Sequence, residues 1–425
     1  MLEKLAINGG PRTIIKPFIR YSSIGAEEAK AAVSVVKTGV LSKFLGCWDP
    51  DFYGGPRVQK FERNWSSYFG SRHAVSVNSN TSGLIAAIGA IGVEPGDEVI
   101  VSPWTMTASA TSILVWNAIP VFADIDPATF NMNVSTIRRK ITSRTRAIML
   151  PDIFGQAADL DEIMQLAKKY KLKVIEDCAQ APGAFYKKKY AGTVADIGVF
   201  SLNYHKHIQT GEGGVCVTND PELAERMQLI RNHGEAVAGD KGISDIRNII
   251  GFNFRMTEIE AAIGIEQLKK LKSLVKQRIR AADALSAGLK DLEGLKTPLV
   301  KNDRTHVYYV YPLVIETDKV GVERSRILLA LQAEGVPNLS EGYALIHLLP
   351  LYQKRIAYGS RGFPWTAPFY DGNVSYDKGI CPVAERLHEQ SFLGMELCKS
   401  QYTDKEVGLV IKAFKKVWLR REELR

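Results

Sequence analysis

Cysteine is scarce in this chain, and long apolar runs are missing. The 425 residues contain five cysteines, none of them in a Cys-x-x-Cys pair: Cys47, Cys178, Cys216, Cys381 and Cys398. An odd number of widely spaced cysteines is typical of reduced thiols, so we expect no disulfide scaffold and predict a cytoplasmic protein. The seven histidines show no His-x-x-x-His spacing, and a catalytic metal is therefore not expected.

Membrane and export signals are absent as well. No apolar run reaches the ~18 residues that a membrane-spanning helix requires. The first twelve residues, MLEKLAINGGPR, lack the apolar core of a secretory signal peptide. We therefore expect no membrane partner.

Blocks of like charge are short, although the net charge is +9. Lysine and arginine are spread along the chain, and no basic helix, zinc cluster or basic strand with interleaved aromatic residues is present. These absences argue against a nucleic-acid partner. The positive balance predicts a solvated surface with a modest preference for a small anionic substrate.

The apolar content, 45% of the residues, suffices for a large core in two domains. Apolar runs at Ile119–Ile125, Ala147–Pro151 and Val174–Glu176 alternate with helical patterns such as Leu160–Tyr170. This alternation is typical of an α/β fold, in which helices cover a mostly parallel sheet.

Composition also suggests where the domains divide. Residues 1–25 contain two glycines in a row and two prolines, which predicts an extended N-terminal arm. From about residue 270 onward the glycine-marked motifs stop. We predict a large domain at 26–270 and a smaller C-terminal domain at 271–425, joined by a long helix.

The segment Phe200–Gly214, FSLNYHKHIQTGEGG, places Lys206 between an apolar strand and a glycine-rich turn. Such strand-to-loop junctions carry the chemistry of α/β enzymes. The earlier run VIED ends in Glu176 and Asp177, and only one of the two can face a shared site because strand side chains alternate. A lysine and a carboxylate on neighbouring strand ends are what pyridoxal 5'-phosphate (PLP) needs, as amine and as partner of the pyridinium nitrogen.

The two stretches VIEDCAQAPGA and FSLNYHKHIQTGEGG resemble the sugar and aminocyclitol aminotransferase family. These are PLP-dependent enzymes of fold type I, similar to aspartate aminotransferase. The resemblance runs from LAINGG at Leu5–Gly10 to the last helix, with several motifs in the same order and at matching spacing. It implies PLP as cofactor, a large domain with a mostly parallel seven-stranded-type sheet, and a smaller α+β C-terminal domain.

The resemblance also assigns the chemistry to residues. It implies that Lys206 forms the Schiff base and moves the proton, and that Asp177 is the acid that meets the ring nitrogen. Gln180 stands where relatives have a residue near the phenolic oxygen of the ring; the alternative is an ordinary polar loop residue. A related dehydratase subgroup has histidine at the lysine position, so Lys206 favours transamination.

A polar turn at Asn78–Leu84, NSNTSGL, opens a predicted helix. Free N–H groups at a helix start bind phosphate, although a plain N-cap by Thr81 explains the same residues. The resemblance favours phosphate, and it implies that Thr81, Ser82 and Ser201 bind it. Many relatives have glycine at the position of Asn80.

Trp104 follows the predicted strand Asp97–Ser102. The resemblance implies that it stacks on the PLP ring; without that motif a core tryptophan is the better interpretation. The aromatic loop at residues 41–56 is long enough for a substrate lid or for a surface excursion anchored by Phe44 and Trp48.

Thr257 and Glu260 form a capping box that predicts the start of a long helix, which extends to about Leu292. Just before it lies NFRMT, which in relatives reaches into the active site of the neighbouring subunit. The resemblance implies that Asn253 touches the partner's phosphate, and therefore that the protein is a homodimer with shared active sites. The alternative is a simple loop that enters the helix.

Together these patterns predict a PLP-dependent aminotransferase that moves an amino group from glutamate or glutamine to a keto sugar, preferentially a nucleotide-linked one. The alternative acceptor is a keto-cyclitol (an inosose). Two other classes stay open: a PLP-dependent sugar dehydratase, and a silent regulator that only binds a metabolite. Both are disfavoured by the presence of Lys206 together with Asp177.

Overall fold

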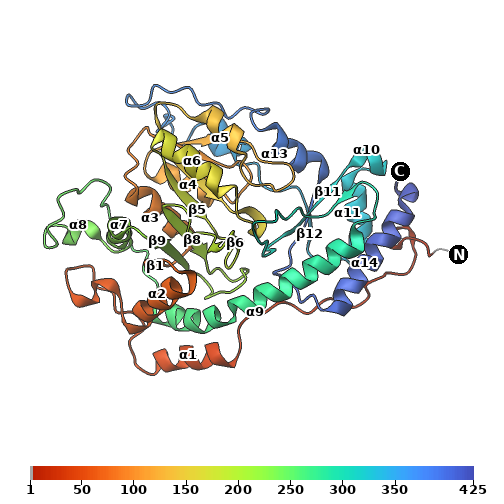
Figure 1. Ribbon diagram of the computed structural model, residues 1–425, viewed down its shortest axis with the longest axis horizontal. Coiled ribbons are helices and arrows are strands. Elements are labelled where there is room, and N and C mark those ends of the chain that lie inside the picture. Colours follow the sequence, from red (N-terminus) through yellow and green to blue (C-terminus); the bar gives the residue numbers. More distant parts are fainter. Residues whose placement is uncertain (1–2) are drawn as a thin grey trace.

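The computed structural model describes residues 3–425, which form two main sheets with their helices (Figure 1). The larger sheet has seven strands in the order β1-β9-β8-β5-β4-β2-β3. In chain order they are β1 (His73–Val77), β2 (Glu98–Val101), β3 (Ile119–Phe122), β4 (Thr145–Pro151), β5 (Lys173–Asp177), β8 (Ile197–Ser201) and β9 (Gly214–Thr218). Only β9 runs antiparallel to its neighbours. The predicted α/β class with a mostly parallel sheet is confirmed.

The strand register brings three strand ends to one edge of this sheet. Asp177, the last residue of β5, pairs with Pro151 at the end of β4 and with Val199 in β8. The central strands read as continuous apolar runs because helices bury them on both faces. The chain leaves all three strands into loops on the same side, which is where α/β proteins place their ligands.

Seven helices of the described residues belong to this layer: α2 (Pro56–Phe69), α3 (Asn80–Ala90), α4 (Ala108–Val115), α5 (Val134–Lys140), α6 (Leu160–Tyr170), α7 (Pro221–Arg231) and α8 (Gly234–Val237). Helix α3 packs on α7 and on β8 and β9. The close approach of α3 to the sheet depends on Gly83, because a Cβ at that position would lie 2.7 Å from Val199 Cγ1 and 3.0 Å from Cys216 Sγ. The glycine therefore sets the distance between the helix and the sheet.

The second sheet is antiparallel, with the strands β10 (Leu295–Lys296), β11 (Tyr311–Ile315), β13 (Phe392–Met395) and β12 (Leu339–Glu341) in that order. Helix α11 (Arg324–Ala333) packs on this sheet, and α10 (Thr317–Val320) and α14 (Asp404–Leu419) contribute to its core cluster. Leu5 of the arm and Leu424 near the C-terminus join the same core cluster. This is the α+β unit that the sequence predicts. A separate small hairpin is formed by β6 (Phe185–Tyr186) and β7 (Lys189–Tyr190).

Helix α9 (Glu258–Leu289) connects the two units (Figure 1). Its 32 residues span about 48 Å at 1.5 Å per residue. It begins at the predicted capping box, in which Thr257 Oγ1 accepts from the Glu260 N–H and the Glu260 carboxylate accepts from the Thr257 N–H. Leu271 belongs to the core of the large sheet and Leu285 to that of the small one. Helix α1 (Ala26–Val36) lies along its first half (Figure 1).

Residues 343–391 follow the predicted start of the small domain, yet they pack largely on the large sheet. Tyr358 Oη donates to the Leu114 carbonyl at 2.9 Å, and Tyr376 Oη donates to the Pro120 carbonyl at 2.8 Å. Helices α12 (Pro350–Gln353) and α13 (Pro382–Arg386) belong to this segment. The large-domain core is therefore not built from one continuous stretch of sequence. In the described part of the chain no helix combines the length and apolar character needed to cross a bilayer.

Candidate active site

The loops after β4, β5 and β8 and the first turn of α3 surround a cavity of about 170 Å³. It lies at the sheet edge where the three parallel strands end. Five of the residues predicted from the sequence line it: Thr81, Asp177, Gln180, Ser201 and Lys206. Three others, Ser82, Trp104 and Asn253, are not among the lining residues.

Lys206 is buried in this cavity, with 8% of its surface exposed. Its Nζ lies 4.3 Å from the centroid of the Tyr309 ring. Burial lowers the pKa of Lys206 to about 8, and the negative charge of Asp177 offsets part of that effect. A neutral amine is the nucleophilic form of lysine, so this environment activates Lys206 close to neutral pH.

The loop that carries Lys206 is closed by its own backbone. Leu202 N donates to the Gly213 carbonyl at 2.8 Å, and Thr210 N donates to the Leu202 carbonyl at 2.9 Å. Gly213 has a φ of +148°, and a Cβ there would lie 2.5 Å from Thr210 Oγ1 and 3.0 Å from Met256 Cε. Only glycine fits this position without strain, which explains the glycine-rich turn after the lysine.

Asp177 faces the same cavity from the end of β5. Ser109 Oγ donates to its Oδ2 at 2.8 Å, and the Ala179 N–H donates to its Oδ1 at 3.2 Å. Burial raises the pKa of Asp177, while the Ser109 hydrogen bond acts in the opposite direction. Asp177 is thus a fixed acid that can hold a proton on a basic nitrogen placed in the cavity.

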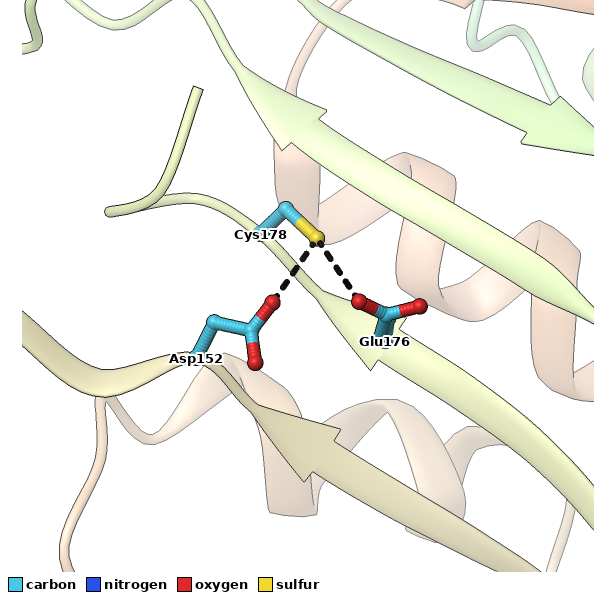
Figure 2. Close-up of side chains that lie close together, drawn as sticks. All are labelled: Asp152, Glu176 and Cys178. Carbon is cyan, nitrogen blue, oxygen red and sulfur yellow. Dashed lines mark hydrogen bonds between the residues drawn. The ribbon is translucent and has the colours of Figure 1, made fainter. Parts of the chain in front are cut away.

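Glu176, the adjacent acid, points to the other face of β5, as strand alternation predicts. Its carboxylate accepts from the N–H of Gly192 at 2.7 Å and of Ala195 at 3.2 Å. Figure 2 shows it beside Cys178 and Asp152, which comes from the loop after β4. Cys178 Sγ lies 3.4 Å from Asp152 Oδ2 and 4.0 Å from Glu176 Oε1.

Burial and the charge of Glu176 raise the pKa of Asp152 well above its ordinary value. The pKa of Glu176 is also raised by burial. The raised pKa favours the neutral form of Asp152, the member of this pair that lines the cavity, and so lowers the negative charge of the cavity wall. The sequence analysis missed Asp152, since a single acid in a loop after an apolar run carries no distinctive signal.

Gln180 is fixed by two hydrogen bonds of its amide. Its Oε1 accepts from the Phe154 N–H at 2.8 Å, and its Nε2 donates to Tyr343 Oη at 3.0 Å. Burial raises the pKa of Tyr343 to about 12, so its hydroxyl stays protonated at neutral pH. Tyr343 belongs to the segment that returns to the large sheet, and no local pattern in the sequence marked it.

On another side of the cavity, the polar turn forms the start of α3, and Ser79, Asn80 and Thr81 of this turn line the cavity. The N-cap is Ser79, whose Oγ accepts from the Ser82 N–H at 3.1 Å, and not Thr81 as the plain-cap alternative held. Ser82 Oγ donates to Asn78 Oδ1 at 2.6 Å and so shapes the turn. The hydroxyls of Thr81 and Ser201 remain on the cavity wall beside the helix start.

Trp104 is fully buried next to this site and does not reach the cavity. The backbone N–H of Trp104 donates to Ser102 Oγ at 3.0 Å in a tight turn after β2. The indole packs against Phe392 at 5.3 Å and Tyr343 at 5.8 Å between ring centroids. The structure therefore gives Trp104 the core position that was weighed as the alternative, while the neighbouring Met106 lines the cavity.

Two further predictions concern surfaces of the chain. Asn253 is exposed, and its carbonyl accepts from Asn78 Nδ2 at 3.3 Å, so it lies beside the turn of α3. In the loop at 41–56, Phe44 is buried and Trp48 is 46% exposed. No residue of that loop lines the cavity of its own chain. Contacts of either segment with a second subunit stay a prediction.

The lining of the cavity fits PLP. One buried space combines a lysine of lowered pKa, a fixed aspartate, and a helix start with two hydroxyls. The lysine suits the aldehyde of PLP, the aspartate suits its pyridine nitrogen, and the helix start suits its phosphate dianion.

Comparison with known proteins agrees with this geometry. Residues 49–390 match the model of the DegT/DnrJ/EryC1/StrS aminotransferase family. The chain belongs to this family. It is an enzyme, an aminotransferase, and PLP is its cofactor.

Relatives with assigned names cover most of the chain. It is 36% identical over 311 residues to a GDP-perosamine synthase of Caulobacter vibrioides, with 72% of this chain and 82% of the relative aligned. It is 33% identical over 414 residues to an L-glutamine:2-deoxy-scyllo-inosose aminotransferase of Streptoalloteichus tenebrarius, with 92% and 94% aligned. The crystal structure of an aminotransferase from Psychrobacter cryohalolentis superposes with a TM-score of 0.80 at 29% identity, covering 95% and 99%.

Proposed function

We propose that this aminotransferase moves an amino group from glutamate or glutamine to a keto sugar, preferentially one linked to a nucleotide. The observation that carries the proposal is the joint burial of Lys206 and Asp177 in one cavity at the ends of β8 and β5. A relative named GDP-perosamine synthase supports a nucleotide-linked acceptor. The positive net charge of +9 suits a substrate that carries phosphate groups.

In this proposal Lys206 holds the cofactor and acts as general base and acid. With a pKa of about 8, its amine can take a proton from the α-carbon of the donor and return it to a neighbouring carbon. When bound, PLP supplies an electron sink that stabilises the negative charge left on that carbon. The Tyr309 ring, 4.3 Å from Nζ, limits where the amine can move.

Asp177 keeps the ring nitrogen protonated in the proposed site. Ser109 and the Ala179 N–H hold its carboxylate in place, so it needs no reorganisation when the cofactor enters. A positive nitrogen next to Asp177 favours the ionised carboxylate and opposes the effect of burial on its pKa. Gln180, held by Tyr343, lines the same cavity and is proposed as the residue near the phenolic oxygen of the ring.

The phosphate end of the proposed site uses the start of α3 and the hydroxyls of Thr81 and Ser201. Ser82 acts on this site indirectly, through the shape of the turn. Asn253 of a second subunit is proposed as an additional phosphate ligand, in agreement with its exposure in the single chain.

A cytoplasmic homodimer with shared sites is part of the proposal. Helix α1 and the five residues after it expose four large aliphatic side chains: Val33 at 51%, Val36 at 56%, Val40 at 43% and Leu41 at 46%. Exposed apolar side chains that gather on one element are typical of an interface. Light scattering of the active enzyme tests this assembly, and a fully active monomer would argue against it.

A keto-cyclitol is the second candidate acceptor, and one observation favours it. The relative named for 2-deoxy-scyllo-inosose aligns with 92% of this chain, whereas the relative named for GDP-perosamine aligns with 72%. Both acceptors present a ketone on a ring with neighbouring hydroxyls, so the same Lys206 chemistry serves either. The difference lies in whether the site accommodates a nucleotide.

The test is a product assay with the PLP-loaded enzyme. Glutamate or glutamine is combined with a nucleotide-linked keto sugar or with an inosose, and the aminated product is measured by mass spectrometry. We expect amination of the nucleotide-linked sugar with at least one donor. Amination of the inosose alone would establish the second candidate, and loss of water from the sugar without amination would identify a dehydratase.

A further inference from the structure

About two thirds of the way along α9, Arg278 is buried, with 5% of its surface exposed. Its Nη1 donates to the Leu274 carbonyl of the same helix at 3.2 Å. Within residues 3–425, Nε and Nη2 have no hydrogen-bond partner. Two other cations of α9 are paired: Lys270 lies 2.7 Å from Glu28, and Arg280 lies 2.8 Å from Asp404. Lys272 and Lys276 are exposed to solvent, whereas Arg278 is buried, and no ion pair with a carboxylate is found for it among residues 3–425.

A buried guanidinium without an anion is costly, because burial removes the water that solvates its charge. The ring of Tyr21 lies 4.2 Å from the Arg278 guanidinium carbon and attracts it. That attraction replaces only a part of the lost hydration and leaves the N–H groups at Nε and Nη2 unsatisfied. The surroundings of Arg278 therefore lack an acceptor for two parallel hydrogen bonds, one from Nε and one from Nη2.

Space for such an acceptor is present. Arg278 lines a cavity of about 250 Å³ between the arm, α9 and the segment 397–403. A single water needs only ~10–15 Å³ of such space, so this cavity is large enough for a small organic or inorganic ion. None of its lining residues lines the cofactor cavity.

The other walls offer hydroxyl and amide donors. Ser22, Gln277, Ser400 and Gln401 line the cavity and carry such donors. Thr403 lines it as well, but its hydroxyl donates to the Glu406 carboxylate. Ser400 Oγ already accepts from Asn338 Nδ2 at 2.9 Å, so its own O–H is free to donate into the cavity. The lining contains no aspartate or glutamate. Cys398 and Tyr21 are the titratable groups beside the guanidinium, and burial raises the pKa of both, so that both stay neutral. A cation among neutral groups, with no carboxylate in the cavity lining, is suited to an anion.

We propose that this cavity binds a small oxyanion, a carboxylate or a phosphate, through the guanidinium of Arg278. The planar fork of arginine matches two oxygens of either group, and the free Nε and Nη2 lie on the same edge of the fork. The hydroxyl of Ser400 donates a hydrogen bond to a further oxygen of the bound anion.

The position of the site links the arm to the catalytic loop. Tyr21, which lies on the guanidinium, donates from Oη to the carbonyl of His207 at 2.8 Å, one residue after Lys206. Its own N–H donates to the Lys399 carbonyl at 3.0 Å. An anion held at Arg278 thus bridges three segments of the chain and stabilises the folded enzyme by mass action.

The experiment measures the thermal unfolding midpoint of the PLP-loaded enzyme against increasing concentrations of inorganic phosphate and, separately, of succinate. Sodium chloride at equal ionic strength is the salt control. The loaded enzyme is used so that the phosphate end of the cofactor cavity is occupied. We expect a midpoint that rises with the logarithm of the concentration of one of the two anions, which also tells phosphate from carboxylate.

Arg278→Met removes the charge at nearly constant volume and should abolish the rise. Arg280→Met is the matched control, because it removes the same charge from the same helix at an exposed ion pair; it should keep the rise. In the absence of anion, Arg278→Met should be at least as stable as the wild type, since it removes an uncompensated buried charge. A purely structural arginine would instead make the variant less stable under those conditions.

Three results would overturn the site: no response of the wild type to either anion beyond the salt control, an equal response in Arg278→Met, or a lower midpoint of anion-free Arg278→Met. Should that variant fail to fold, Arg278→Lys keeps the charge but loses the fork. Its affinity for the anion should fall about tenfold, which corresponds to one lost charge-assisted hydrogen bond. An unchanged affinity in Arg278→Lys would equally contradict the proposal.

Discussion

The amine of Lys206 and the carboxylate of Asp177 lie in one buried cavity, each delivered by the end of a neighbouring parallel strand. The charge of Asp177 offsets part of the fall in the pKa of Lys206 that burial causes. The same aspartate is held by Ser109 at 2.8 Å. The predictions below start from this pair and from the contacts that fix it.

Replacement of Lys206 by alanine should lower turnover by at least ~10²–10⁴-fold, the range that a positioned acid or base contributes. The fold should persist, because the side chain makes no hydrogen bond that the structure needs. Steady-state assays and circular dichroism check the two statements. Lys269→Ala, an exposed change on α9, is the control and should behave like the wild type. Turnover of Lys206→Ala within tenfold of the control would exclude Lys206 as the catalytic base.

Asp177→Asn should reduce the rate by ~10²-fold or more, because it removes the charge that holds a proton on the ring nitrogen. Ser109→Ala should lower kcat less, by about tenfold, which is the low end of the ~1.5–3 kcal/mol that a hydrogen bond to a charged group contributes. Measurement of kcat for both variants tests whether Asp177→Asn loses more activity than Ser109→Ala. A larger loss in Ser109→Ala than in Asp177→Asn would show that the carboxylate does not act through its charge.

The lowered pKa of Lys206 also predicts how the cofactor-free enzyme responds to pH. The pKa is about 8 in the folded chain against an ordinary value of 10.5. Between these values the unfolded chain binds more protons, so the contribution of Lys206 to the unfolding free energy rises with pH through this window. The full gain is on the order of 3 kcal/mol. Below about pH 8 both states are protonated, and the contribution is constant.

Urea unfolding of the cofactor-free wild type and of Lys206→Met at pH 8, 9 and 10 isolates this term, because other titrating groups are common to both proteins. The difference in unfolding free energy should shift in favour of the wild type as pH rises. A difference that is independent of pH would mean that the amine is not desolvated.

Gly83→Ala should destabilise the protein by about 1–3 kcal/mol, since the added Cβ overpacks against Val199 and Cys216. Gly408 in α14 offers a matched control, because a Cβ there meets nothing within 4 Å. Gly408→Ala should stabilise the helix by about 0.5–1 kcal/mol. Thermal or urea unfolding of both variants tests the opposite signs; a neutral Gly83→Ala would mean that α3 does not pack as closely on the sheet.

Trp104→Phe distinguishes a core tryptophan from one that stacks on the cofactor. The indole is fully buried among Phe392, Tyr343 and their neighbours, so the change should cost about 1–3 kcal/mol of stability. The visible absorbance of bound PLP should stay the same. Trp65→Phe, at another fully buried indole, should give a similar loss. A shifted cofactor spectrum in Trp104→Phe alone would place the ring against Trp104.

Local pattern predicted much of this fold. The bounds of α6 match the predicted Leu160–Tyr170, and those of β2 and β4 lie within two residues of the predicted Asp97–Ser102 and Ala147–Pro151. The helix has a regular amphipathic period, and the two strands are short apolar runs. Helix α4 (Ala108–Val115) was missed, because ASATSILV has neither an amphipathic period nor a side chain that caps its start.

The site was predicted only as far as strand ends determine it. Lys206 and an acid at the end of the run VIED follow from where β8 and β5 stop, and strand alternation allows only one of Glu176 and Asp177 to face the site. The choice of Asp177 and the role of Ser201 were implied by the family resemblance. The direction of Trp104 depends on a turn held by Ser102, and the presence of Tyr343 depends on a segment that folds back from far along the chain. Such tertiary contacts leave no periodic signal in the sequence.

The most direct test of the central claim is the half-reaction with the amino donor. The yellow PLP-loaded enzyme is mixed with glutamate or with glutamine, without acceptor, and the visible spectrum is followed for the wild type and Lys206→Ala. We predict that one donor removes the visible absorbance of the wild type as the cofactor takes up the amino group, and that Lys206→Ala shows no such change at a comparable rate. A wild-type spectrum that neither donor alters, or an equally fast change in Lys206→Ala, would contradict amino transfer at Lys206.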